Sequence, residues 1–183
     1  MQRIALLGVG TMGAGMAANW LAKGFPLSVW NRTSAKAEAL AANGTKIGKN
    51  PRDAANGADF IFAMVSDDAA SRGVWLGPDG ALAGAKAGAI AVESSTLTPG
   101  WVRELAERAR EKGLGFLDAP VGASRPAAAS GASLARRSAA AARKGCARYA
   151  SAACRAAPTG FGAKAGRYPP RPPATRETTS RPP

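Results

Sequence analysis

The stretch Arg3–Ala22 reads RIALLGVGTMGAGMAANWLA and decides the fold of the amino-terminal part of the chain. Its apolar segment 4–7 has the length of a short strand and runs directly into Gly8-x-Gly10-x-x-Gly13. The Ala-rich segment that follows carries apolar residues at helical spacing. This order of strand, turn and helix indicates that Gly8 permits a sharp turn, Gly10 leaves the backbone bare, and Gly13 allows the helix to pack closely.

The first N–H groups of that helix are expected to point at the glycine turn, where the positive end of the helix dipole favours a phosphate. Because the strand, the motif and the helix occur together, we predict that a dinucleotide binds at this turn. A glycine-rich turn that serves only packing is the alternative interpretation. The candidate contact residues in the turn are Gly8, Val9, Gly10, Thr11, Met12 and Gly13.

A second predicted strand, 27–30, delivers Asn31, Arg32 and Thr33 to its carboxyl end. This position, about 20 residues beyond the glycines, meets the adenosine ribose in dinucleotide-binding units, and an acidic residue there binds the free 2′-hydroxyl. Arg32 stands here instead, and a guanidinium pairs well with a phosphate. We therefore predict NADP as the cofactor, with NAD as the alternative. A solvated loop arginine that binds no ligand is the competing interpretation of Arg32.

Strands and helices alternate through the rest of the first 121 residues, which predicts a parallel α/β sheet flanked by helices and joined by right-handed crossovers. Ligands bind at the carboxyl ends of strands in such sheets, so Val65, Ser66 and the hydroxyls of 94–96 belong to the ligand edge. Asp67 and Asp68 are expected to cap the next helix. The further predicted strands are 59–65, 89–93 and 115–118, and the further helices are about 33–42, 51–56 and 101–112.

The composition changes abruptly near residue 131. Residues 131–183 hold eleven Lys and Arg against one acidic residue, so most of the formal net charge of +13 lies there, and Leu134 and Phe161 are almost its only large apolar residues. Such a segment cannot bury enough apolar surface to offset its ordering entropy. The sequence predicts a folded domain over 1–130 and a disordered Ala/Arg/Pro-rich tail over 131–183. A basic arm that binds nucleic acid or another polyanion is the less favoured alternative.

Several classes of site are excluded by residue usage. The chain has no histidine, and its two cysteines, Cys146 and Cys154, both lie in the tail, so we predict no metal site and no disulfide framework. No apolar segment approaches the roughly 20 residues that a membrane helix needs. The amino terminus is not a secretory signal, because its apolar core is too short. These features predict a cytoplasmic protein without a membrane partner.

Five motifs together resemble the β-hydroxyacid dehydrogenase family, which includes 3-hydroxyisobutyrate dehydrogenase, glyoxylate/succinic semialdehyde reductase and, more distantly, 6-phosphogluconate dehydrogenase. The motifs lie at 8–19, 30–33, 64–68, 94–96 and 118–121. The resemblance implies a Rossmann domain and hydride transfer between NADP(H) and a small hydroxy acid or semialdehyde. The cofactor contacts that it implies are Gly8, Gly10, Gly13, Arg32, Thr33, Val65, Ser66 and Thr96.

The resemblance also implies a substrate-binding loop and a second domain. The substrate carboxylate is expected near Gly122, Ala123 and Ser124. Family members continue into a helical domain that supplies a catalytic lysine and often the oligomer interface, and 131–183 does not have the sequence of such a domain. Lys164 is the one candidate for that lysine, with a solvated tail lysine as the alternative. We expect a truncated or frameshifted chain with impaired catalysis, and we predict no oligomeric state.

Overall fold

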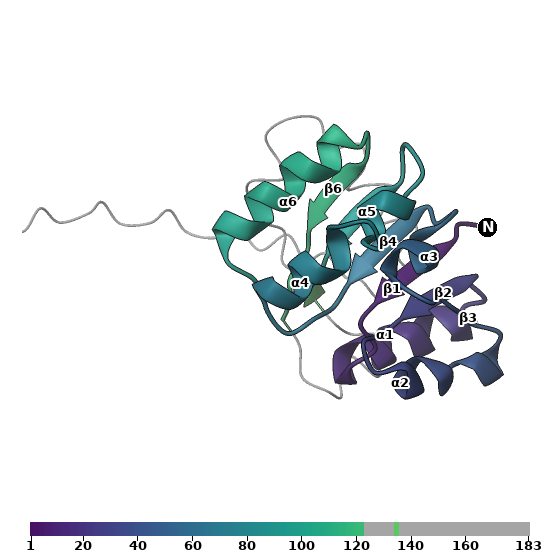
Figure 1. Cartoon of the computed structure of the whole chain (residues 1–183). Helices are drawn as coiled ribbons and strands as arrows, with labels where there is room; N and C mark the ends of the chain where they lie inside the picture. The colour runs from purple at the N-terminus through teal and green to yellow at the C-terminus, as the bar shows by residue number, and fades with distance from the viewer. Residues whose placement is uncertain (123–133, 136–183) are drawn as a thin grey trace, which may run out of the picture.

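The computed structural model describes residues 1–122 and 134–135 and contains a six-stranded sheet in which all neighbouring strands are parallel (Figure 1). The predicted parallel α/β sheet is therefore confirmed. Strands β1 (Ile4–Leu7), β4 (Phe60–Ala63) and β5 (Ile90–Glu93) lie in the interior of the sheet, and all of their apolar residues except the half-buried Phe62 are buried. The order across the sheet is β3 (Lys46–Ile47), β2 (Leu27–Trp30), β1 (Ile4–Leu7), β4 (Phe60–Ala63), β5 (Ile90–Glu93) and β6 (Gly115–Asp118).

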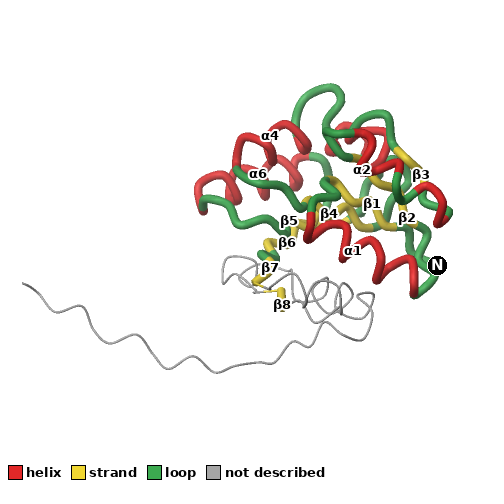
Figure 2. The backbone as a smooth tube through the Cα atoms, turned by 90° about the horizontal axis from the view of Figure 1, so that it is seen from below, coloured by secondary structure: helices red, strands yellow, loops and turns green. Residues whose placement is uncertain are grey.

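Helices cover both faces of this sheet, as Figure 2 shows for α1 (Thr11–Ala22) on one side and for α4 (Asp68–Trp75) and α6 (Pro99–Glu111) on the other. The connections between successive parallel strands contain these helices, because a parallel pair requires a crossover. The helices are α1 (Thr11–Ala22), α2 (Ser34–Glu38), α3 (Pro51–Ala55), α4 (Asp68–Trp75), α5 (Ala81–Gly84) and α6 (Pro99–Glu111), with a 3-10 turn at Ala41–Asn43.

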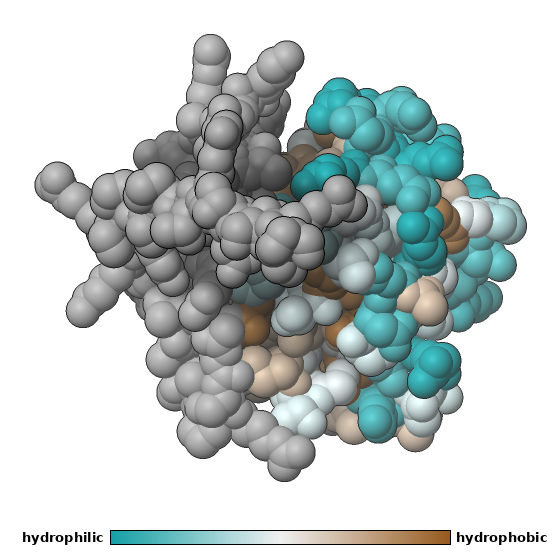
Figure 3. Space-filling model, turned by 90° about the vertical axis from the view of Figure 1, so that its left-hand side faces the viewer, coloured by the Kyte–Doolittle hydropathy of each residue, from teal (hydrophilic) through white to brown (hydrophobic). Residues whose placement is uncertain are grey.

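Alternation along β1 divides the core into two layers, because successive strand residues face opposite sides of a sheet. Leu6 packs with Trp20 of α1, whereas Leu7 packs in the layer that contains Trp75 of α4 and Leu105 of α6. Figure 3 shows one outer face, with hydrophilic residues over most of the described surface and apolar residues between them. Among the described residues, Met1 is the only large apolar side chain that is strongly exposed.

Side-chain caps fix where three helices begin. The Asn50 side chain accepts from Asp53 N at the start of α3, the Asp67 side chain accepts from Ala70 N at α4, and that of Thr98 accepts from Trp101 N at α6. These caps satisfy N–H groups that the first helical turn leaves unpaired. The prediction for Asp67 is confirmed. Asp68 has another role, since its carboxylate accepts hydrogen bonds from the N–H and hydroxyl of Thr98.

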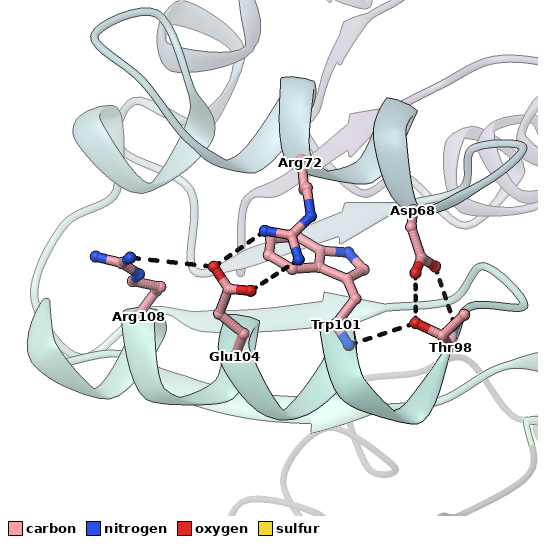
Figure 4. Close-up of polar contacts among 6 residues, drawn as sticks. All are labelled: Asp68, Arg72, Thr98, Trp101, Glu104 and Arg108. Carbon is pink, nitrogen blue, oxygen red and sulfur yellow. Dashed lines mark hydrogen bonds and ion pairs between the residues drawn. The ribbon is translucent and has the colours of Figure 1, made fainter.

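Contacts between α4 and α6 hold these two helices together (Figure 4). Arg72 donates two hydrogen bonds to Glu104, at 3.0 and 2.7 Å, and its guanidinium lies 4.1 Å from the centroid of the Trp101 ring. The bonds from Arg72 lower the pKa of the Glu104 carboxyl below its ordinary value. Trp101 is buried in the core. The Arg72–Glu104 pair covers it, so the contact between α4 and α6 extends from the core to the surface.

Several short elements differ from the sequence prediction. The helix expected over about 33–42 ends at Glu38, and a 3-10 turn leads to Gly44, whose φ of 76° is left-handed. Strand β3 and helix α5 are too short, at two and four residues, to give a periodic pattern. Beyond the sheet, β7 (Val121–Gly122) pairs antiparallel with β8 (Leu134–Ala135). No strand was expected at 134–135, because the composition of 131–183 predicts a disordered tail, whereas this two-residue strand depends on pairing with β7.

Candidate functional site

A pocket of about 810 Å³ opens at the carboxyl ends of β1, β2 and β4. This is the edge at which parallel α/β sheets bind ligands, and the sequence predicts a site there. The turn between β1 and α1 forms one part of its wall. The residues of this turn that line the pocket are Gly8, Gly10, Thr11, Met12 and Gly13.

Each of the three motif glycines meets a different steric condition. Gly8 has a φ of 99°, and a Cβ atom built there lies 2.3 Å from the carbonyl oxygen of Met64. A Cβ atom on Gly13 lies 2.0 Å from the carbonyl oxygen of Gly8, so α1 packs directly against the turn. A Cβ atom on Gly10 meets nothing within 4 Å, although Gly10 lines the pocket. Gly8 and Gly13 are therefore required by the fold, whereas the space beside Gly10 is open to a ligand.

The amino terminus of α1 has the features of an anion site. Gly10 caps the helix without a side-chain hydrogen bond, and the first turn contains no acidic residue. The first N–H groups of a helix lack partners within the helix, and together with the helix dipole they favour a phosphate or carboxylate. The open space at Gly10 and this uncapped terminus fit the pyrophosphate of a dinucleotide.

The carboxyl end of β2 supplies the basic side of the pocket. Trp30, Asn31, Arg32 and Thr33 line it, together with Lys36 from the short helix α2. Arg32 and Lys36 lie four positions apart, and both are exposed to solvent. Because they bring two positive charges to one rim, this end of the pocket suits a phosphate group.

The Asn31 amide joins the two loops that form this region. Its Oδ1 accepts from Val9 N at 3.0 Å, and its Nδ2 donates to the carbonyl oxygen of Thr33 at 2.9 Å. The N–H of Gly8 also donates to the carbonyl oxygen of Trp30, at 2.8 Å. These bonds fix the glycine turn against the loop that carries Arg32.

The opposite wall comes from the end of β4 and from α4. Its α4 residues are mostly small, which leaves room for a flat group between them and the end of β2. An acid, Asp67, also lines this wall, and hydrogen bonds from the Ser66 hydroxyl and the Ala70 N–H lower its pKa, with a further contribution from the charge of Arg32. The residues of this wall are Met64, Val65, Ser66, Asp67, Ala69, Ala70, Gly73 and Val74.

The structure brings ten of the twelve predicted cofactor contacts to this pocket. Val9 does not line it, because its side chain is buried in the core layer with α1 and its N–H bonds Asn31. Thr96 is exposed beyond the end of β5 and is also absent from the lining. Gly122 lies in β7 and is not among the residues that line the pocket. The candidates Ala123, Ser124 and Lys164 lie outside the described residues.

Sequence reasoning missed the α4 wall and Lys36. Helical spacing does not connect Lys36 with Arg32, because Arg32 precedes α2, which begins at Ser34. The spacing of Ala69, Ala70 and Gly73 places three small residues on one helical face, but close helix packing requires the same pattern. Their role emerges only once α4 is placed beside β4.

The part of the chain that the structure describes contains neither a cluster suited to a metal ion nor a membrane-spanning helix. Over residues 1–122 and 134–135, no three acidic, cysteine or histidine side chains come together in a manner suited to a metal ion. Within the same residues, every helix is too short or too polar to cross a membrane.

Comparison with known proteins shows the family of this chain. The model of the NAD-binding domain of 6-phosphogluconate dehydrogenase matches residues 3–147. The chain is 38% identical over 131 residues to a NAD-dependent L-serine dehydrogenase of Pseudomonas aeruginosa, covering 72% of this chain and 44% of that protein. It is 39% identical over 124 residues to the cytokine-like nuclear factor N-PAC of Danio rerio, covering 68% of this chain and 27% of that protein.

A solved structure of 3-hydroxyisobutyrate dehydrogenase from Mycobacterium tuberculosis, with L-serine, superposes with a TM-score of 0.69 at 30% identity. The match covers 74% of this chain and 45% of the other. The chain thus spans less than half the length of these three proteins. The glycine turn, the parallel sheet and the family match agree: the chain belongs to the family of the 6-phosphogluconate dehydrogenase NAD-binding domain, among the β-hydroxyacid dehydrogenases.

Proposed function

We propose that this domain binds NADP(H) in preference to NAD(H). The supporting observation is the pair Arg32 and Lys36 on one rim of the pocket, at the end of β2 where a carboxylate would select a free 2′-hydroxyl. In this proposal the 2′-phosphate lies at these two side chains. The pyrophosphate lies at Gly10 and the amino terminus of α1, and the adenine lies between the end of β2 and the small residues of α4.

We further propose that the chain derives from an enzyme that moves a hydride between NADP(H) and a small hydroxy acid or semialdehyde. The family match supports the class of reaction, and a relative named for L-serine supports a small hydroxy acid. The nicotinamide supplies the hydride when the cofactor is bound, and the residues of the pocket bind and orient that cofactor. The segment Gly122, Ala123 and Ser124 is proposed to hold the substrate carboxylate, and Thr96 to contact the nicotinamide half.

Turnover by this chain is proposed to be impaired. The composition of 131–183, rich in Ala, Arg and Pro, is unlike a helical catalytic domain, and Lys164 is its one candidate for a proton donor. For the organisation of the chain we propose a Rossmann domain over 1–130 and, apart from β8 at Leu134–Ala135, a disordered tail over 131–183.

Cofactor choice is tested by titrating the full chain with NADPH and with NADH and following tryptophan fluorescence, since Trp30 lines the pocket. We expect NADPH to bind at least about tenfold more tightly, because a charge-assisted hydrogen bond contributes about 1.5–3 kcal/mol. Arg32→Ser should remove most of this difference by weakening NADPH alone.

Arg103→Ser is the matched control, because Arg103 is exposed on α6 and does not line the pocket. It should leave both dissociation constants unchanged. Equal binding of NADPH and NADH by the unaltered chain would contradict the proposed preference. Failure to bind either nucleotide would contradict the proposed site as a whole.

A second candidate function is a nucleotide-binding module that is not an enzyme and carries a basic polyanion-binding arm. The concentration of positive charge in 131–183 favours it, and one relative is named a nuclear factor. Binding to DNA of arbitrary sequence should then weaken steeply with salt and disappear when 131–183 is deleted. Salt-independent or undetectable DNA binding by the full chain would contradict this second function.

A further inference from the structure

A fully buried carboxylate, Glu93, lies at the carboxyl end of β5 and accepts three hydrogen bonds. Its Oε2 accepts from the Ser71 hydroxyl at 2.7 Å and from the Trp75 indole N–H at 2.8 Å, both on α4. Its Oε1 accepts from the N–H of Ser95 at 3.0 Å. One side chain therefore connects the interior face of α4 with the backbone that follows β5.

Ser95 continues this connection toward the pocket. Ser95 is 1% exposed, and its Oγ accepts from Val65 N at 2.9 Å. Val65 and Ser66 lie at the end of β4 and line the pocket, whereas Glu93, Ser95 and Ser71 do not. A continuous path of hydrogen bonds thus runs from α4 through Glu93 and Ser95 to the pocket wall.

Hydrogen-bonding capacity explains why a glutamate suits this place. The three neighbours all present donors, and an ionised carboxylate is an acceptor at both oxygens. A buried donor that loses its acceptor carries the full desolvation penalty, so each partner is held firmly in place. The geometry of Ser95, and through it that of the Val65 amide, depends on where Glu93 Oε1 lies.

We infer that Glu93 is a positioning residue of the cofactor pocket, which acts through Ser95 to hold the Val65–Ser66 turn in its binding conformation. The inference rests on the proposed function, because it assumes that this pocket binds the dinucleotide. A role confined to packing α4 against the sheet makes a different prediction. Stability would then fall with any of the three bonds, and cofactor affinity would not distinguish among them.

Ser95→Ala and Ser71→Ala form a matched pair for the test, because each removes one buried hydroxyl from the same path. Ser95→Ala leaves the Val65 N–H without its acceptor, whereas Ser71→Ala removes a donor on the side of α4 and leaves Ser95 bonded to Glu93. We expect Ser95→Ala to weaken NADPH binding about fivefold or more, and Ser71→Ala to change it less than about twofold.

Hydrogen exchange at the Val65 amide gives a readout that does not require the cofactor. Exchange should accelerate in Ser95→Ala and remain close to that of the unaltered chain in Ser71→Ala. Glu93→Gln adds an amide donor that must face either Ser95 N–H or the two donors of α4, so it should accelerate the same exchange and weaken NADPH binding. Urea unfolding of each full-length variant identifies any general loss of stability.

The outcomes separate the two proposals. If the unaltered chain binds neither NADPH nor NADH, the proposed function fails, and Val65 exchange still tests the hydrogen-bond path. If the unaltered chain binds NADPH and Ser95→Ala binds it within about twofold as tightly, the positioning role of Glu93 is overturned. Equal weakening by Ser71→Ala and Ser95→Ala, with equal losses of stability, would also overturn it.

Discussion

At the scale of single residues, Asn31 has a role that its position in the sequence does not reveal. The sequence predicts it as a cofactor contact, and it does line the pocket. Its amide, however, already makes two hydrogen bonds within the protein: the oxygen accepts from Val9 N, and the nitrogen donates to the carbonyl oxygen of Thr33. Asn31 therefore holds the glycine turn and the Arg32 loop in fixed relative positions.

Replacing Asn31 with Ala should lower both stability and cofactor affinity. The buried Val9 would lose the acceptor for its N–H, which costs about 1–3 kcal/mol of unfolding free energy. The Arg32 loop would lose its attachment at Thr33, so we expect NADPH to bind about tenfold more weakly. Urea unfolding measures the first effect, and fluorescence titration measures the second.

Asn31→Asp and Asn43→Ala provide the comparison. An Asp at position 31 keeps an acceptor for Val9 N but cannot donate to Thr33, so it should restore stability more than affinity. Asn43 is exposed in the 3-10 turn, outside the pocket lining, and its replacement should change neither quantity. Full NADPH affinity in Asn31→Ala would show that the two loops do not need this connection.

At the scale of elements, the unit of β1, turn and α1 separates the needs of folding from those of binding. Gly13→Ala forces a methyl group against the Gly8 carbonyl oxygen, 2.0 Å away, so α1 must shift. We expect a loss of about 2 kcal/mol in unfolding free energy, because this overlap exceeds the roughly 1 kcal/mol gained from helix propensity. Chemical unfolding followed by circular dichroism measures this loss.

Gly10→Ala is the matched substitution in the same turn. The added methyl group meets no protein atom within 4 Å, and the φ of −66° and ψ of −170° suit an alanine. Stability should fall by less than about 1 kcal/mol, whereas NADPH binding should weaken at least about tenfold because the methyl group occupies space left for the phosphates. Unimpaired NADPH binding by Gly10→Ala would place the pyrophosphate elsewhere.

At the scale of the whole molecule, two carboxylates link stability to acid pH. The pKa of Asp59 is lowered mainly by a hydrogen bond from Lys86 and, to a smaller extent, by one from the Arg3 N–H. The pKa of Asp53 is lowered mainly by a hydrogen bond from Lys46 and, to a smaller extent, by one from the Lys49 N–H. Asp59 thereby ties the start of β1 to the segment before β5. Both pKa values lie below those of the unfolded chain, so both groups favour the folded state when ionised.

The resulting contribution to stability is complete above the unfolded pKa of about 3.9 and is lost as pH falls through the folded pKa values. We expect urea midpoints to be nearly constant between about pH 5 and 7 and to decline below about pH 4. Asp59→Asn should be less stable at neutral pH and should show a shallower acid decline. An acid decline of the same steepness in Asp59→Asn would mean that Asp59 does not contribute to it.

Prediction from sequence succeeded where local periodicity and tertiary packing favour the same structure. In β1 and β2 a short apolar run has the length of a strand, and the motif glycines after β1 permit a sharp turn into a helix. The place of these elements in the sheet therefore followed from the sequence alone. Strand β3 and helix α5 were missed, because elements of two and four residues have no measurable period. Val9 was misplaced for a similar reason: a residue inside a binding motif can face the core, and no spacing rule shows this.

The sequence by itself determined the parallel α/β class, the position of the ligand edge and the basic residue at the end of β2. Each of these follows from chain order and local residue type, which do not change on folding. Only the tertiary structure decided that α4 supplies the second wall of the pocket and that the Asn31 amide bonds two loops together. It also decided that hydrogen bonds connect Glu93 with Val65 through Ser95. The hydrogen bonds that join these segments connect residues 18 to 30 positions apart, and their side chains meet only after the sheet has brought the strand ends together.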